Sequence, residues 1–168
     1  MNLLYCCGLA LLLAGCAPEV KNPDGSPAEA FYTESSIGDG VRLPLLKPYE
    51  ILRLTGETHW LMNCFNGLGS IDQVNKVAVV DSVMVLYAAG KIADKLRESY
   101  ISEAWYVIIP AKKVELQFDH RKDFVAYLRT LHVDPARVRL YPIDSVFASF
   151  ERKYPIDWVH DFRHLSGQ

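Results

Sequence analysis

The sequence lacks the motifs by which an activity is usually recognised. It has no glycine-rich phosphate loop, no serine nucleophile elbow, no Cys-x-x-Cys pair and no pair of carboxylates at catalytic spacing. Its 18 basic and 20 acidic residues nearly balance, and adjacent basic residues form only short pairs of the kind that usually lie on a solvated face. The composition therefore gives no electrostatic footprint for nucleic acid. Because 50% of the residues are hydrophobic, a packed core is expected.

The N-terminus carries a short apolar run. Residues 3–13 fit the hydrophobic region of a signal peptide, and they are too few for a spanning helix, which needs ~20 apolar residues. The run ends in Leu13, Ala14, Gly15 and Cys16, which resemble the lipobox of bacterial lipoproteins. The resemblance implies a diacylglycerol thioether on Cys16 and cleavage of the chain immediately before it.

This resemblance divides the chain into three parts. Residues 1–15 are expected to be a signal peptide, residues 16–36 a lipidated cysteine with a flexible Pro-rich tether, and residues 37–168 a single globular domain. One feature departs from the lipoprotein pattern, because no Lys or Arg precedes the apolar run. A buried N-terminal helix of a cytosolic protein is the alternative interpretation.

Cysteine is too scarce for an intramolecular disulfide. Of the four cysteines, Cys6 and Cys7 leave with the signal peptide and Cys16 carries lipid, so only Cys64 remains in the domain. Free cysteines are commonly buried, and we expect the Cys64 thiol to be buried and unreactive. A Cys64 nucleophile with His59 as its base is disfavoured, because their odd spacing places them on opposite faces of a strand.

Apolar runs predict an antiparallel sheet. We expect strands at residues 49–54, 58–65, 104–109 and 113–118, the last with Glu115 on its solvated face. Residues 74–80 and 83–89 are expected to form a hairpin that turns at Asp81 and Ser82, with one long bulged strand as the alternative. The polar stretch 90–103 is expected to be a surface loop or a short helix.

The hydrophobic period becomes helical after residue 118. An amphipathic helix capped by Asp119 should bury Phe124 and Leu128, while Asp144 should cap a second helix and Asp157 a last turn. A short strand is expected at residues 138–141. Strands followed by helices predict the α+β class, as an antiparallel β-meander with C-terminal helices packed on one face.

The same order of elements resembles a group of uncharacterised small bacterial lipoproteins. The resemblance covers about residues 41–133 and is carried by four stretches: residues 48–53, 74–89, 104–109 and 124–128. It implies a β-meander followed by an amphipathic helix, and it transfers no activity and no functional residue.

The best candidate for a metal site lies at the C-terminus. On a helix, Asp157 lies one turn before His160, and His160 and His164 share a face, so that the three could hold Zn²⁺ with one position open. The alternative, which we favour, is a solvated helix face opposite Trp158 and Phe162. No other cofactor is expected.

Two other features have both a functional and a structural interpretation. Asp81 lies in an apolar segment and could mark a buried site, but a turn explains it better. Trp60, Trp105 and Tyr106 could line a ligand groove, but aromatic residues at this density are usually core.

These observations favour a non-enzymatic lipoprotein of the cell envelope that is anchored through Cys16 and binds a protein partner. Ala17, in place of an aspartate after the cysteine, implies the outer membrane by the same resemblance. One alternative is a metal-dependent enzyme or binder using Asp157, His160 and His164. The other is a small-ligand carrier built on a sheet face.

The double substitution His160→Ala and His164→Ala tests the C-terminal metal site. If these side chains only face solvent, the free energy of unfolding should change by less than about 0.5 kcal/mol. Calorimetric titration with Zn²⁺ gives the second measurement. Stoichiometric binding by the wild type that is lost in the double variant would contradict the solvated-face interpretation.

Overall fold

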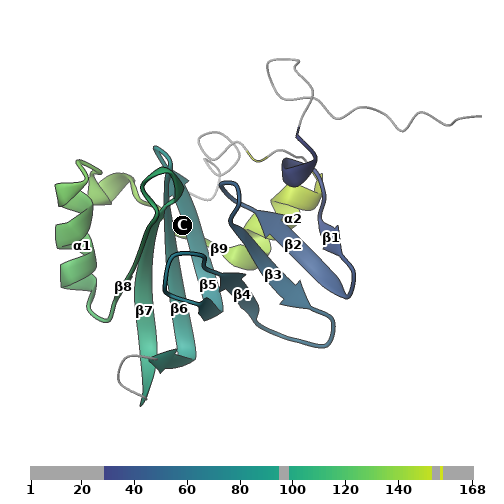
Figure 1. Cartoon of the computed structure of the whole chain (residues 1–168), viewed down its shortest axis with the longest axis horizontal. Coiled ribbons are helices and arrows are strands. Elements are labelled where there is room, and N and C mark those ends of the chain that lie inside the picture. The colour runs from purple at the N-terminus through teal and green to yellow at the C-terminus, as the bar shows by residue number, and fades with distance from the viewer. Residues whose placement is uncertain (1–28, 95–98, 153–155, 157–168) are drawn as a thin grey trace, which may run out of the picture.

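The chain folds around one open antiparallel sheet. The computed structural model describes residues 29–94, 99–152 and 156. Eight strands pair in chain order, β1-β2-β3-β4-β5-β6-β7-β8, and a ninth, β9, pairs with β5. Two α-helices follow the meander, one on either side of the central strands (Figure 1). The predicted α+β class and meander order are therefore confirmed.

The strands share one antiparallel pattern but differ greatly in length. They are β1 (Ser36–Ile37), β2 (Gly40–Pro44), β3 (Glu50–Leu54), β4 (Trp60–Asn63), β5 (Ser70–Val80), β6 (Val83–Asp94), β7 (Ser99–Ile109), β8 (Val114–Phe118) and β9 (Tyr141–Pro142). The α-helices are α1 (Arg121–Thr130) and α2 (Ile143–Arg152), and single 3₁₀ turns lie at Ala30–Tyr32, Pro110–Lys112 and Pro135–Arg137. Residues 30–32 lie within the range expected to be tether.

The hairpin of β5 and β6 has the predicted two-residue turn. Val80 pairs with Val83, and Asp81 and Ser82 have φ angles of 48° and 66°. Positive φ at both central residues is the geometry whose twist matches that of a hairpin, and aspartate tolerates it. Asp81 is exposed and forms an ion pair with Arg137 at 3.7 Å, so the turn interpretation of Asp81 is confirmed.

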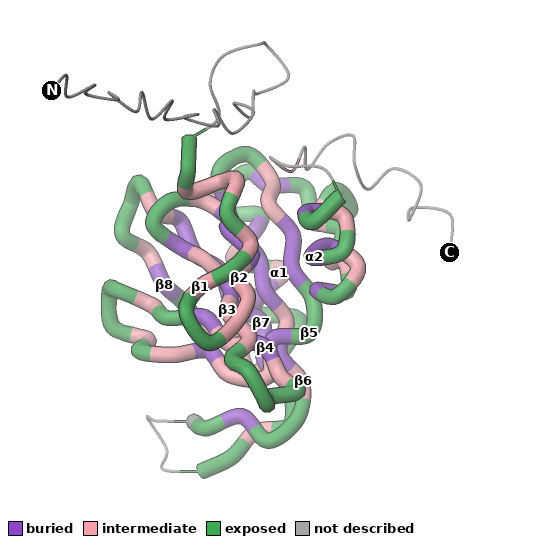
Figure 2. The backbone as a smooth tube through the Cα atoms, turned by 90° about the vertical axis from the view of Figure 1, so that its right-hand side faces the viewer, coloured by how far each residue is buried: buried purple, intermediate pink, exposed green. Residues whose placement is uncertain are grey.

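The prediction of a loop or helix at residues 90–103 is wrong. β6 continues to Asp94 and β7 begins at Ser99, with Ile92 paired to Ile101 and a register shift near Gly90. Gly90 has a φ of 138°, which suits the bulge. The two strands project beyond the rest of the sheet and are largely exposed there (Figure 2). Their polar composition therefore reflects exposure to solvent.

The two helices cover opposite faces of the sheet, which corrects the expectation that both lie on one face. Val85 and Val107 pack with Phe124 and Leu128 of α1. Leu86, the neighbour of Val85, packs instead in the cluster that contains the buried face of α2. The apolar runs in β6 and β7 are continuous because successive side chains are buried on both faces.

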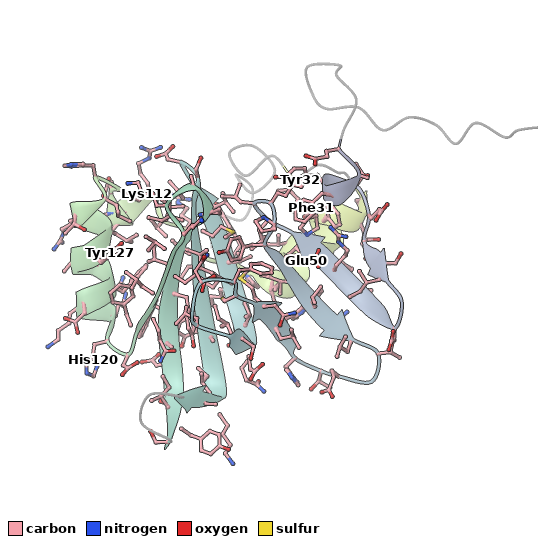
Figure 3. All side chains as sticks on the ribbon, in the orientation of Figure 1. Phe31, Tyr32, Glu50, Lys112, His120 and Tyr127 are labelled. Atoms are coloured by element: carbon pink, nitrogen blue, oxygen red, sulfur yellow. The ribbon has the colours of Figure 1, made fainter. Side chains whose placement is uncertain are left out.

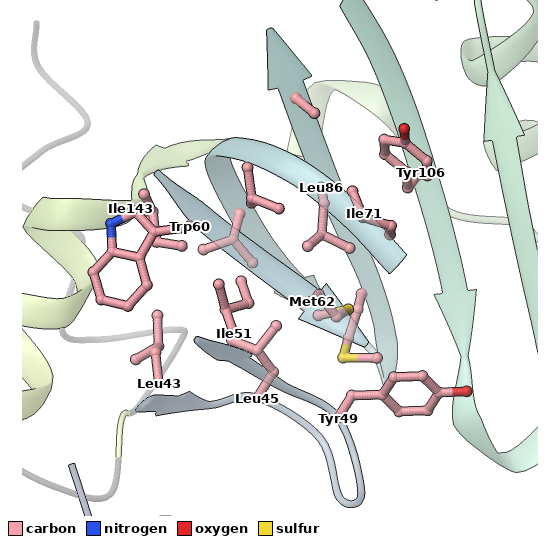
Figure 4. Close-up of a cluster of buried hydrophobic side chains, with 14 of the residues drawn as sticks. Leu43, Leu45, Tyr49, Ile51, Trp60, Met62, Ile71, Leu86, Tyr106 and Ile143 are labelled. Carbon is pink, nitrogen blue, oxygen red and sulfur yellow. The ribbon is translucent and has the colours of Figure 1, made fainter. Parts of the chain in front are cut away.

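The larger cluster, around α2, lies on one face of the sheet and includes side chains from β2 to β7. Its α2 members are Ile143, Val146, Phe147 and Phe150, each at most 7% exposed. They belong to the same cluster as side chains from β2, β3, β4 and β5. The close-up shows Ile143 of α2 beside Trp60 of β4 (Figure 4). β9 leads directly into α2 and pairs with β5 at Val77, beyond the point where the pairing of β4 ends. The helix is therefore tied to the sheet by backbone as well as by side chains.

Gly40 tests the close approach of β2 and β3. A Cβ atom on Gly40 would lie 2.5 Å from the carbonyl oxygen of Arg53 and 3.0 Å from Cα of Leu54. Gly40→Ala should therefore lower the free energy of unfolding by about 1–3 kcal/mol through overpacking. Ser36→Ala, on the exposed side of the neighbouring β1, should change it by less than about 0.5 kcal/mol. Equal urea midpoints for both variants would show that β2 and β3 accommodate the added methyl group without loss of stability.

Candidate functional site

One carboxylate is buried in the structure. Glu115 lies on β8 and is 9% exposed. Among residues 29–94, 99–152 and 156, it is the one charged residue that is buried. It pairs across the ladder with Ile108, a member of the larger cluster. The expectation that Glu115 faces solvent is therefore wrong: the apolar Leu116 beside it is 37% exposed instead.

Donors from Tyr49 and from the loop between β4 and β5 surround this carboxylate. Oε1 accepts hydrogen bonds from the Tyr49 hydroxyl at 2.8 Å, the Phe65 backbone N–H at 2.6 Å and the Asn66 side-chain amide at 3.4 Å. Oε2 accepts from the backbone N–H groups of Asn66 at 2.9 Å and Leu68 at 3.3 Å. Backbone N–H groups that converge in this way form a concavity suited to an anion. No Lys or Arg of the described chain forms an ion pair with Glu115.

These contacts shift the pKa values of both titratable partners. Burial by itself would raise the pKa of Glu115, but hydrogen bonds from Phe65, Tyr49, Asn66 and Leu68 outweigh it and lower this pKa. Burial first, and then the hydrogen bond to the carboxylate, raise the pKa of Tyr49 to about 12. Near neutral pH the carboxyl is thus ionised and the phenol protonated.

The Glu115 cluster is therefore suited to holding segments together. An ionised carboxylate cannot donate a proton, and both oxygens of Glu115 already accept hydrogen bonds. The cluster ties β8 to Tyr49, which directly precedes β3, and to the loop between β4 and β5. Sequence reasoning missed it because the partners lie 47 to 66 residues from Glu115, and no local pattern indicates such a contact.

A second polar cluster joins β3, β4 and α2. The Asp144 carboxylate accepts hydrogen bonds from Trp60 Nε1 at 2.9 Å and Arg53 Nη1 at 3.2 Å. The guanidinium of Arg53 lies 4.5 Å from the Trp60 ring centroid, within range of a cation–π interaction. The expectation that Asp144 caps α2 is wrong, because the helix begins at Ile143. Asp144 lies within the first turn, and its carboxylate links that turn to the sheet.

The candidates at the two termini lie outside the described residues. These are Cys16 for lipidation and Asp157, His160 and His164 for metal binding. Within the part of the chain that the structure describes, no group of three or more His, Cys, Asp or Glu side chains is arranged to hold a metal ion.

Cys64 is half-buried, whereas burial was expected. It packs at the margin of the larger cluster, because it directly follows β4 and begins the loop that surrounds Glu115. Nδ1 of His59 lies 3.3 Å from a carboxylate oxygen of Glu57.

The three aromatic candidates for a ligand groove belong to the core. Trp60 and Tyr106 are each 2% exposed and Trp105 is 8% exposed, so the core interpretation is confirmed. The expectation that Asp119 caps α1 is wrong. His120 occupies that position without a capping bond from its side chain, and Asp119 accepts a hydrogen bond from Gln117 at 3.2 Å.

Among the described residues, one side of β8 has no paired strand. β8 is the last strand in the sheet order, and the strand described beside it is β7. β1, at the other end of the order, has two residues and offers little backbone. The large hydrophobic side chains that are exposed in the described chain are Leu54, Phe65, Tyr100 and Leu116. Of these, Leu116 lies on β8, and the backbone of Phe65 bonds to Glu115 on β8. We call the outer side of Val114–Phe118 the β8 edge.

Glu115→Gln tests the buried carboxylate. The substitution keeps the shape but removes the charge that five donors stabilise, so the free energy of unfolding should fall by about 2 kcal/mol at pH 7. Because the pKa of Glu115 is lowered in the folded state, its contribution is present above the ordinary value of 4.5 and is lost as the pH falls through the folded value. The loss of wild-type stability at acidic pH should therefore be steeper than that of the variant.

Glu103→Gln is the matched control. Glu103 is an exposed carboxylate that also accepts a hydrogen bond from a tyrosine, the hydroxyl of Tyr87 at 2.9 Å. This substitution should change the free energy of unfolding by less than about 0.5 kcal/mol. Urea unfolding of the full chain across pH measures both variants. Equal stability and equal acid profiles for the two would show that the Glu115 cluster contributes nothing.

The Glu115 cluster, the Asp144 cluster and the β8 edge thus differ in which polar groups remain available to a partner. The Glu115 and Asp144 clusters use their polar groups to join elements of the domain, whereas the β8 edge leaves backbone groups and an apolar side chain exposed. No protein-family model, no curated protein and no solved structure matches the chain.

Proposed function

We propose that the chain is a lipid-anchored protein of the cell envelope whose folded domain binds another protein. The anchor is proposed from Leu13, Ala14, Gly15 and Cys16, and the outer membrane from Ala17. No helix in the described ranges has the length and apolar character to span a bilayer.

The β8 edge is the observation that carries the proposal of protein binding. An exposed edge strand offers unpaired N–H and C=O groups and is a template for another chain. A small-ligand carrier has less support, because both faces of β6 and β7 are filled by the side chains of the two clusters. An enzymatic role has less support, because the carboxylate that lies deepest is saturated by donors.

Cys16→Ser tests the anchor. A serine hydroxyl cannot form the thioether, so the variant should incorporate no label when cells are grown with radioactive palmitate. The wild type should be labelled and should sediment with the outer membrane. Cys64→Ser removes the other cysteine outside the proposed signal peptide and should keep the label. A wild-type protein without label would overturn the lipoprotein assignment.

Cross-linking in intact cells tests the binding of a partner. A photoreactive amino acid is placed at exposed positions around the domain, one per variant of the full chain. Binding predicts a discrete adduct of higher mass from a contiguous group of positions. If every position gives only the monomer, the proposed function is wrong, because no part of the tested surface then binds a partner.

A further inference from the structure

We propose that the β8 edge binds an extended, acidic segment of a partner protein, which adds to the sheet as a further strand next to β8. The inference rests on the proposed function of protein binding and specifies the surface and the chemistry of the partner.

In the described part of the chain, no strand pairs with the outer side of β8. Its ladder with β7 runs from Val114 paired with Ile109 to Phe118 paired with Trp105. In the described ranges, no backbone hydrogen bond outside the regular helices and strands involves residues 114–118. The outer N–H and C=O groups can therefore pair with a strand supplied by another chain, which is the mode of recognition known as β-addition.

The edge is held rigid from both faces of the sheet. On one face, the hydrogen bonds of Glu115 fasten β8 to the loop between β4 and β5. On the other face, the Phe118 ring lies 6.2 Å from Phe124 and 5.4 Å from Tyr127 of α1, measured between ring centroids. A strand that is already ordered loses little conformational entropy on binding.

Exposed apolar side chains lie on each side of this edge. Leu116 is 37% exposed on the α1 side of the sheet. Phe65 is 60% exposed, and its N–H bonds to Glu115 on the other side. Side chains of an added strand point alternately to the two faces, so one set would contact Leu116 and the other set Phe65.

Basic pairs flank β8 and determine the charge of the partner. Lys112 and Lys113 come directly before the strand, and Arg121 and Lys122 follow it at the start of α1. All four are exposed, and none forms an ion pair with a described residue. Lys112 and His120 mark the two ends of the strand in Figure 3. Glu115 is turned inward and satisfied by donors. Asp119 and Asp123 adjoin Arg121 and Lys122, so the excess positive charge is greatest at Lys112 and Lys113, where acidic side chains of the partner are favoured.

The same charges argue against a second copy of this chain. In an antiparallel pair of β8 strands, Lys112 and Lys113 of one copy would lie beside Arg121 and Lys122 of the other. A parallel pair would place each basic pair beside its own equivalent. Both arrangements bring like charges together, which is destabilising.

Three synthetic peptides test the inference on the full-length lipidated protein in detergent. The first is a fluorescent peptide in which seven alternating valine and threonine residues are extended by two glutamates at each end. The second has lysines in place of the glutamates. The third keeps the glutamates but carries N-methyl groups on alternate amides, so that it cannot form a ladder. Fluorescence anisotropy should show that the acidic peptide binds at least about tenfold more tightly than either control.

Charge reversal on the protein gives the matched test. Lys113→Glu with Lys122→Glu should weaken binding of the acidic peptide about tenfold or more. Arg129→Glu with Arg152→Glu makes the same change in net charge at the exposed ends of α1 and α2 and should leave binding within about twofold. Urea midpoints near that of the wild type establish that both double variants are folded. Binding of the N-methylated peptide as tightly as the first, or equal loss in both double variants, would overturn the inference.

The photoreactive positions in cells separate this inference from the proposed function. Adducts that form at Leu116 and disappear with Lys113→Glu and Lys122→Glu support both. Adducts that form only at other positions leave protein binding in place and overturn the assignment of the β8 edge. A second copy of this chain in the Leu116 adduct would also overturn it.

Discussion

A buried negative charge, for which the described residues supply no cationic partner, constrains the arrangement of the sheet. Placing a carboxylate away from water costs several kcal/mol unless hydrogen bonds replace its hydration. For Glu115 these bonds come from the Tyr49 hydroxyl and from the loop that carries Phe65, Asn66 and Leu68. β8 can therefore occupy its place only if the early strands and this loop occupy theirs. The position of the open edge, and with it the proposed interface, depends on that arrangement.

Local patterns in the sequence predicted the elements whose determinants are local. The Asp81-Ser82 hairpin, the apolar strand at residues 104–109 and the inward faces of both α-helices follow from turn chemistry and periodicity. The structure of residues 90–103 was predicted wrongly, because a pair of solvent-exposed strands and a loop have similar polar compositions. The opposite placement of the helices also escaped prediction. A continuous apolar run shows that both faces are buried and does not show which element covers each.

The features relevant to function were predicted less well, for a physical reason. Glu115 alternates with apolar neighbours in the way of a solvated strand residue, and only contacts with distant residues reverse its environment. The β8 edge becomes visible only when the strand order is known. The lipidation motif at Cys16 is by contrast read from contiguous residues alone, and it remains a prediction, as does the metal interpretation of Asp157, His160 and His164.

The meander order has a consequence for the path of folding. Each strand from β1 to β8 pairs with its neighbour in the chain, so most loops that close during folding are short and entropically inexpensive. The hydrogen bonds of Glu115 and Asp144 are exceptions, since they join positions up to 66 and 91 residues apart, respectively. When the chain is made from its N-terminus, neighbouring strands can pair one after another. Tyr49 and the loop after β4 cannot form their hydrogen bonds to Glu115 until β8 has been made. The step that brings Glu115 to these donors is then also the step that removes its charge from water.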